Sequence, residues 1–120
     1  MRAHLLRWQR EGYPDFHQNR TNLLLHIVSV PLFISATLSV AFNLATMQWI
    51  AAAGSFVTMI VAFALQAIGH KREKNPAIPF EGVGDVVTRI FAEQFVTFPR
   101  FFFSGAFFTA LRGNAPSHTD

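Results

Sequence analysis

The chain contains no cysteine, and no Asp, Glu, Lys or Arg occurs between residues 21 and 70. The absence of cysteine excludes disulfides, thiolate metal sites and cysteine nucleophiles. A soluble domain rarely remains uncharged over such a length, and the 120 residues are 51% hydrophobic but only 14% charged. This composition differs from that of an average soluble domain and indicates a membrane protein. No internal repeat divides the chain, so we expect a single domain.

Basic residues lie on both sides of the uncharged stretch and give a formal net charge of +3. Positive charge next to apolar segments is typical of proteins that contact anionic lipid head groups. The sequence has no basic stripe interleaved with aromatic residues, so it does not indicate nucleic-acid binding. We expect membrane lipids as partners and no nucleic acid.

Two apolar segments within this stretch are long enough to cross a membrane. Residues 23–44 and 49–68 comprise 22 and 20 residues, and a helix of about 20 residues spans the hydrocarbon core of a bilayer. A short uncharged turn joins them, whereas arginines precede the first segment and three basic residues at 71–74 follow the second. The bias of basic residues towards the cytoplasm predicts a hairpin with both termini on the cytoplasmic side. Small residues at 51–55 allow close helix packing, within one chain or between copies, so a homo-oligomer remains open.

The remaining segments are shorter or more polar. Residues 1–15 combine arginines with leucines and a tryptophan, which is typical of either an interfacial amphipathic segment or a frayed polar terminus. The helical spacing of apolar residues at 83–98 predicts an amphipathic helix, and the 11 apolar residues of 101–111 are too few for a comfortable crossing. We expect interfacial or re-entrant helices over 83–111, with a third crossing as the alternative, and a polar tail at 112–120. The expected fold class is an all-α membrane protein with a transmembrane hairpin, an interfacial amphipathic helix and a short apolar C-terminal helix.

Two histidines and two asparagines lie where the first apolar segment begins, in the sequence FHQNRTNLLLHIVSVP. Asn19 and Asn22 are residue types that accept hydrogen bonds from the first turn of a helix, so we expect a helix to begin there. On that helix Asn19, Asn22 and His26 share one face. His17 can join them only if the chain turns before Asn19, and Pro14 favours a turn at this point.

The hairpin brings a third histidine to the same side of the membrane. His70 follows the second apolar segment, at a depth similar to that of His26. A single histidine near a helix end is more often structural, but three that converge with His17 are candidates for a functional site. Glu73 lies one turn after His70 and would complete a set of imidazoles and one carboxylate, which is the ligand set of non-haem Fe(II) oxygenases. A solvated Glu73 that pairs with a neighbouring lysine or arginine is the simpler alternative.

Two other functions agree with the same residues. His26 and His70 could be the axial ligands of a haem held between two helices. The hairpin could also be a non-catalytic membrane element, whose histidines can all be replaced without loss of function. The absorption spectrum and the metal content of the purified protein distinguish these possibilities.

The motif FHQNRTNLLLHIVSVP resembles the histidine-asparagine segment of a family once known only as a domain of unknown function and now linked to 2-hydroxy fatty acid dioxygenases, the phytosphingosine-to-odd-chain-fatty-acid metabolism proteins. A second motif, AIGHKREKNPAI, is similar to the glycine-histidine segment of that family, and the resemblance extends over about residues 13–103. The resemblance implies a membrane enzyme that uses Fe(II) and O2 to shorten a 2-hydroxy fatty acid by one carbon.

The same resemblance implies the site residues. The metal ligands would be His17, His26 and His70. Asn22 and Glu73 match further residues of the two motifs and would act in catalysis or orient a ligand. The implied partners are a fatty acyl substrate, O2 and membrane lipids, and the metal site would lie on the cytoplasmic side.

Overall fold

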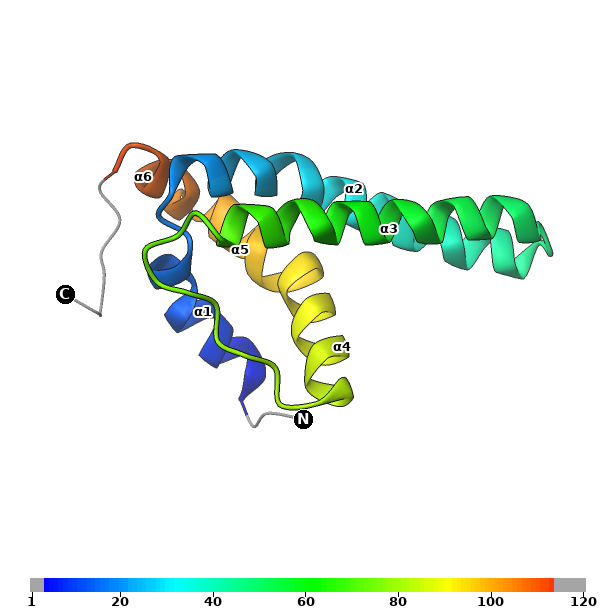
Figure 1. Cartoon of the computed structure of the whole chain (residues 1–120), viewed down its shortest axis with the longest axis horizontal. Coiled ribbons are helices and arrows are strands. Elements are labelled where there is room, and N and C mark those ends of the chain that lie inside the picture. The colour runs from blue at the N-terminus through cyan, green and yellow to red at the C-terminus, as the bar shows by residue number, and fades with distance from the viewer. Residues whose placement is uncertain (1–3, 114–120) are drawn as a thin grey trace.

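The computed structural model describes residues 4–113, and within this range every regular element is a helix (Figure 1). The elements are α1 (Leu5–Phe16), α2 (Arg20–Ala45), α3 (Trp49–His70), α4 (Val83–Ala92), the π-helical turn η1 (Glu93–Thr97), α5 (Phe98–Phe103) and α6 (Ala106–Leu111). The all-α fold class is confirmed. The ends of the chain, residues 1–3 and 114–120, lie outside the described residues, and so do most of the expected polar tail and both termini.

A long hairpin of α2 and α3 dominates the fold. The two helices run antiparallel side by side, and in Figure 1 they extend far beyond the other elements. Both are long and apolar enough to cross a membrane, as judged by length and composition. The expected segments 23–44 and 49–68 lie within them, and many of the apolar side chains on the outside of the hairpin are exposed. These are the properties of helices whose surroundings are apolar.

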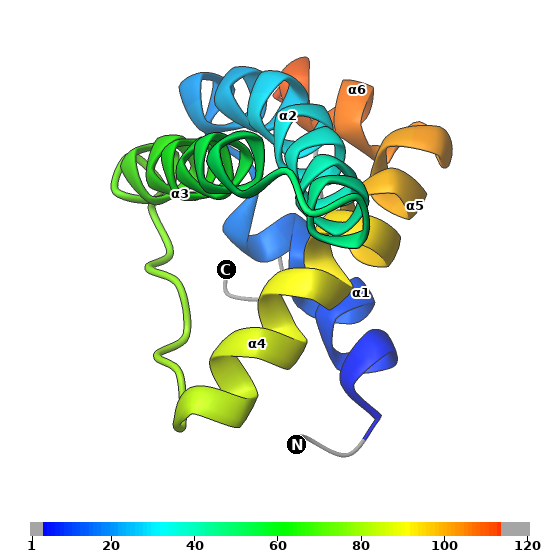
Figure 2. The ribbon, with the colours of Figure 1, turned by 90° about the vertical axis from the view of Figure 1, so that its right-hand side faces the viewer.

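The other helices pack around the end of the hairpin at which α2 begins and α3 ends. Figure 2 shows α2 between α3 on one side and α5 and α6 on the other, with α1 and α4 beneath. The buried core connects α1 and α2 with α5 and α6, and its members are Tyr13, Leu23, Val30, Phe98, Phe101, Phe107 and Ala110. This core holds the non-hairpin helices against α2.

A sharp turn separates α1 from α2. The side chain of Asn19 accepts a hydrogen bond from the backbone N–H of Asn22 over 3.1 Å, so the expected helix start at Asn19 is confirmed. The turn that His17 needs is also present, but it lies at residues 17–19, because α1 continues through Pro14 to Phe16. Residues 5–15 of the segment predicted as either interfacial or frayed are therefore helical, with Tyr13 and Asp15 buried. The interfacial placement stays a prediction.

The apolar segment at 101–111 is not one continuous helix. It is divided between α5 and α6, of six residues each, and Gly105 between them has a φ of 88°, a left-handed conformation that favours glycine. A six-residue helix is about 9 Å long, far short of a bilayer core. Among residues 4–113 only α2 and α3 qualify as membrane spans, so the third crossing is not supported.

The amphipathic helix α4 turns its polar residues inward. Asp85 is 7% exposed and the side chain of Arg89 is 11% exposed, whereas Val83 and Val87 are 81% and 50% exposed. A helix of a soluble protein has the opposite arrangement, with its apolar stripe facing the core. The inward polar stripe continues one turn further to Glu93, at the start of η1.

Candidate metal centre

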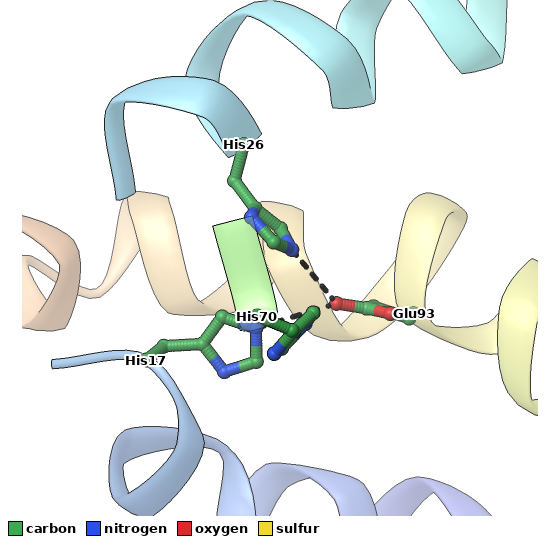
Figure 3. A group of neighbouring side chains, drawn as sticks. All are labelled: His17, His26, His70 and Glu93. Carbon is green, nitrogen blue, oxygen red and sulfur yellow. Dashed lines mark ion pairs between the residues drawn. The ribbon is translucent and has the colours of Figure 1, made fainter. Parts of the chain in front are cut away.

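Four side chains from four parts of the chain converge at the base of the hairpin. They are His17 from the α1–α2 turn, His26 from α2, His70 at the end of α3 and Glu93 at the start of η1 (Figure 3). Each offers one ligand atom, and these atoms all lie within 4.8 Å of one another. Two atoms bound to one ion at about 2.1 Å lie at most about 4.2 Å apart. Small adjustments of the side chains therefore suffice for a shared ion.

Backbone carbonyls fix the tautomers of two of these imidazoles. His17 Nδ1 lies 2.9 Å from the carbonyl oxygen of Tyr13, and His26 Nδ1 lies 3.0 Å from that of Asn22. A carbonyl can only accept, so each Nδ1 carries the hydrogen and each Nε2 presents a lone pair. Metal-binding histidines are commonly oriented by a hydrogen bond of this kind from the other ring nitrogen.

Three of the atoms that face one another in the cluster are acceptors, namely the Nε2 atoms of His17 and His26 and the Oε2 atom of Glu93. The Nε2 atoms of His17 and His26 are buried without a hydrogen-bond partner and lie 3.5 and 3.4 Å from Glu93 Oε2. His70 Nδ1 is also buried without a partner. Lone pairs that face each other without a hydrogen between them need a cation, because each is otherwise desolvated at a cost. The residues present therefore fit a divalent metal with nitrogen and oxygen ligands.

The protonation states also suit a metal. Burial lowers the pKa of His17, and the neighbouring His26 lowers it further. Glu93 has the opposite effect, but the net shift is downward and favours the neutral imidazole. Burial alone raises the pKa of Glu93, but its contacts with His17 and His26 outweigh this effect and hold the pKa well below the ordinary value. Metal ligation requires a neutral imidazole and an ionised carboxylate, and these two pKa shifts are in the directions that favour those forms at His17 and Glu93.

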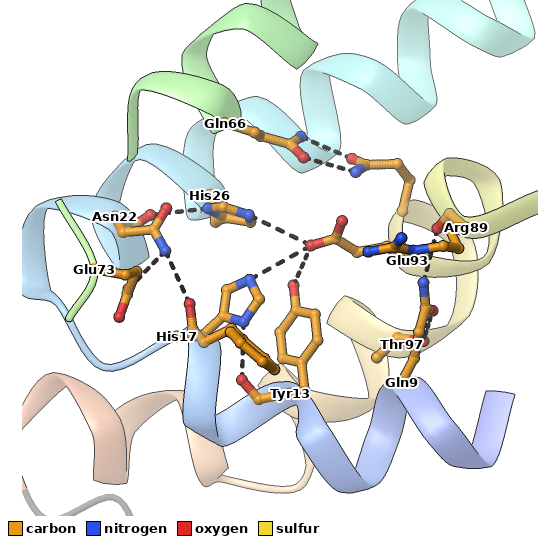
Figure 4. Close-up of polar contacts among 12 residues, drawn as sticks. Gln9, Tyr13, His17, Asn22, His26, Gln66, Glu73, Arg89, Glu93 and Thr97 are labelled. Carbon is orange, nitrogen blue, oxygen red and sulfur yellow. Dashed lines mark hydrogen bonds and ion pairs between the residues drawn. The ribbon is translucent and has the colours of Figure 1, made fainter. Parts of the chain in front are cut away.

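Tyr13 supports the cluster from α1. Its hydroxyl donates a hydrogen bond to Glu93 Oε2 over 2.7 Å, and its ring stacks on that of His17 with centroids 3.6 Å apart (Figure 4). Burial, together with the negative charge of Glu93, raises the pKa of Tyr13 well above the ordinary value. The hydroxyl therefore keeps its proton and remains a donor that orients the carboxylate.

A haem does not fit between these histidines. The rings of His26 and His70 lie 5.0 Å apart at 88° to each other, and the ring of His17 packs against both, at 4.9 and 4.7 Å. A bis-histidine haem needs its flat macrocycle between the two axial ligands. At a centroid separation of 5.0 Å the rings of His26 and His70 leave no room for a macrocycle between them, so the geometry favours a single ion.

A cavity of about 330 Å³ adjoins the cluster. His17, His70 and Glu93 contribute to one part of its wall. Much of the remaining wall is apolar and comes from Trp8, Phe16, Phe63, Ala67, Ala77, Ile78, Phe80 and Ile90. An apolar cavity of this size with a few convergent polar groups is typical of a site for a small organic ligand.

A family model described as 2-hydroxy-palmitic acid dioxygenase Mpo1-like matches residues 5–99. The chain belongs to this family. The matched range contains all four members of the cluster, and the resemblance drawn from the two sequence motifs is confirmed. No curated protein and no solved structure matches the chain.

In this Mpo1-like chain the three histidines predicted from the sequence come together, but Glu73 does not join them. Its carboxylate accepts hydrogen bonds from the backbone N–H groups of Gln18 and Asn19 and from Asn22 Nδ2, at 2.7–3.1 Å. Glu73 would lie one helical turn beyond His70 only if the helix continued that far, and α3 ends at His70. Glu73 instead holds the turn that carries His17. A catalytic role of Glu73 stays a prediction.

Asn22 lies beside the cluster and forms hydrogen bonds with both His26 and Glu73. Its carbonyl orients His26, and its side-chain amide donates to Glu73 Oε2 over 2.7 Å. Gly69 packs so closely on Asn22 that a Cβ at this glycine would lie 2.2 Å from Asn22 Oδ1. The assignment of Asn22 to a substrate or ligand oxygen stays a prediction, whereas its place between His26 and Glu73 is given by these contacts.

Sequence reasoning missed Glu93 and Tyr13 in this Mpo1-like site. The apolar spacing that predicts an amphipathic helix at 83–98 does not single out Glu93. The spacing of Asp85, Arg89 and Glu93 at intervals of four residues was the available signal, since it marks one face. For a helix next to a membrane that face can point inward, and here it does.

Proposed function

We propose that this protein is a non-haem Fe(II) dioxygenase that acts on 2-hydroxy fatty acids at a membrane and shortens them by one carbon. The observation that carries the proposal is the set of buried imidazole nitrogens and one carboxylate that face one another next to an apolar cavity. The name of the family supports the substrate class. Imidazole and carboxylate ligands suit iron, and four protein ligands leave positions open.

Bound Fe(II) would supply the redox chemistry with O2 and a place for the oxygen atoms of the substrate. The residues of the chain hold and orient this centre. His17, His26, His70 and Glu93 provide the ligand atoms, and Tyr13 keeps the carboxylate of Glu93 in place. The Nδ1 hydrogen bonds of His17 and His26 keep their Nε2 lone pairs directed into the cluster.

The cavity suits the acyl part of the proposed substrate. Burial of each methylene group against apolar walls contributes about 0.8 kcal/mol to binding. The acyl chain of the substrate therefore binds where Phe16, Ile78 and Ile90 exclude water. The cavity wall formed by α3 includes Phe63 and Ala67, and both residues are exposed. We infer that the acyl chain reaches the cavity from the side of α3 that faces lipid.

The placement at a membrane has two supports. The helices α2 and α3 are long and apolar enough to cross a bilayer, and α4 exposes Val83 and Val87 while it buries its polar side. We propose that the base of the hairpin lies at the cytoplasmic interface, in agreement with the basic residues at 71–74. There the polar head of a fatty acid meets the metal while its tail remains in apolar surroundings.

The test is turnover by purified protein in lipid nanodiscs, loaded with Fe(II) and supplied with 2-hydroxypalmitic acid and O2. We expect O2 uptake and an acid one carbon shorter, identified by mass spectrometry. Palmitic acid, which lacks the 2-hydroxyl group, and the His26→Ala variant are the matched controls, and neither should yield product. Iron-loaded wild-type protein that leaves 2-hydroxypalmitic acid unchanged would refute the proposed reaction.

A further inference from the structure

Two glutamine side chains form a closed pair in the interior, between α3 and η1. Gln66 Nε2 donates to Gln94 Oε1 over 2.8 Å, and Gln94 Nε2 donates to Gln66 Oε1 over 2.7 Å (Figure 4). Gln66 is 2% exposed and Gln94 is 0% exposed. Two primary amides have been removed from water at a position where a pair of apolar side chains would satisfy the packing. Unlike apolar side chains, a pair of amides has directional hydrogen bonds, so it fixes the register of η1 against α3.

The pair lies next to two members of the metal cluster. Gln66 is four residues before His70 on α3 and shares its face. Gln94 directly follows Glu93 in η1. Within residues 4–113 the structure gives no other side-chain hydrogen bond between α3 and η1. The amide pair therefore connects the element that carries one ligand with the element that carries another.

The element that carries Glu93 is itself unusual. The turn Glu93–Thr97 is π-helical, a rare form that is often found at functional sites. On its other side Thr97 donates to Gln9 Oε1 over 2.6 Å, and Gln9 Nε2 donates to the carbonyl of Arg89 over 2.9 Å. Hydrogen bonds from two different helices thus hold this wide turn. A shift of η1 along α3 by one residue would break both bonds of the amide pair, whereas apolar contacts would tolerate such a shift.

We propose that Gln66 and Gln94 are positioning residues of the metal centre, because their reciprocal amide pair sets the separation of His70 and Glu93. This inference rests on the metal centre proposed above. Neither glutamine contacts an ion. Each acts through a neighbouring ligand, in the way that outer-shell partners typically alter metal affinity 10–100-fold.

The experiment compares Gln66→Leu/Gln94→Leu with wild-type protein, using Co(II) as the probe. Replacing both amides leaves no unpaired polar group, so the melting temperature of the metal-free protein should stay close to that of the wild type. Co(II) should bind about 10–100-fold more weakly, and its d–d absorption spectrum should change because the ligand positions are less well defined. A spectrum of this kind reports the ligand arrangement, which a purely structural role would leave unaltered.

The matched control is Ser39→Ala/Ser55→Ala. It removes a 2.6 Å hydrogen bond between α2 and α3, together with the bonds that Asn43 Nδ2 donates to both serines, in another part of the hairpin. It should leave Co(II) binding unchanged. If the double leucine variant does not fold, Gln66→Met/Gln94→Met, which keeps the length of both side chains without an amide, should show the same weaker binding and altered spectrum. Wild-type affinity and spectrum in the folded leucine or methionine variant would overturn the inference alone. Wild-type protein that binds neither Co(II) nor Fe(II) would overturn it together with the metal centre.

Discussion

Replacement of Glu93 or Glu73 tests which carboxylate holds the metal. Glu93 Oε2 faces the Nε2 atoms of His17 and His26 at 3.5 and 3.4 Å. Glu73 makes its hydrogen bonds to the α1–α2 turn. We therefore expect Glu93→Ala to lose bound Fe(II) and Glu73→Ala to retain it at one ion per chain. Loss of an outer-shell partner typically weakens binding about 10–100-fold, so removal of a ligand should exceed that range.

The two variants should rank the other way round in stability, because Glu73→Ala should lower the free energy of unfolding more than Glu93→Ala does. The carboxylate of Glu73 accepts from three donors, the backbone N–H groups of Gln18 and Asn19 and the side chain of Asn22. A hydrogen bond to a charged group contributes about 1.5–3 kcal/mol, and water can reach part of this half-buried site in the variant. We expect the free energy of unfolding to fall by about 3 kcal/mol in Glu73→Ala. For a chain of this size that corresponds to a melting temperature lower by about 10 °C.

Metal content is measured by mass spectrometry of protein purified without chelators or a histidine tag, and stability by thermal unfolding of the metal-free form. The metal-free form is needed because a bound ion adds its own stabilisation. Metal loss in Glu73→Ala with full metal content in Glu93→Ala would refute the assignment. The sequence-based choice of Glu73 as a ligand would then be the correct one.

Two further variants probe the packing around the site. Gly69→Ala places a Cβ 2.2 Å from Asn22 Oδ1 and should lower the free energy of unfolding by about 1–3 kcal/mol. The control is Gly54→Ala, which has nothing within 4 Å of the added Cβ and should not lower it. Equal losses in both variants would contradict the close approach of Gly69 to Asn22. Ala67→Phe should fill part of the cavity, so KM for 2-hydroxypalmitic acid should rise while the iron content stays unchanged. Ala64→Phe, on the same helix but outside the cavity wall, is its control, and an unaltered KM in Ala67→Phe would place the acyl chain elsewhere.

The hairpin and the three histidines were predictable because each depends on local information. The uncharged run defines the two long helices, and the cap at Asn19 defines where the first of them begins. Once the hairpin is accepted, His26 and His70 must lie at the same end. His17 then needs only a short turn, and the structure supplies it at residues 17–19.

The carboxylate was not predictable in the same way. Glu73 is close to His70 in sequence, but its position depends on where α3 ends, and helix ends are set by tertiary contacts that the pattern does not show. Glu93 is separated from the nearest histidine in sequence by a loop and a whole helix. Only the packing of α4 and η1 against the hairpin, including the Gln66–Gln94 pair, brings it to the cluster.

The two imidazoles of the hairpin and the charged carboxylate of the cluster come from different kinds of helix. The long apolar helices α2 and α3 contribute only imidazoles, which are neutral when they bind a metal. A carboxylate on either helix would place a charge at membrane depth, where it is costly. Glu93 instead belongs to the continuous α4–η1 segment beside the hairpin, in which Asp85 is buried while Val83 and Val87 are exposed. The negative charge that a divalent ion requires is therefore supplied from outside the apolar run, next to the cavity where a polar lipid head group would arrive.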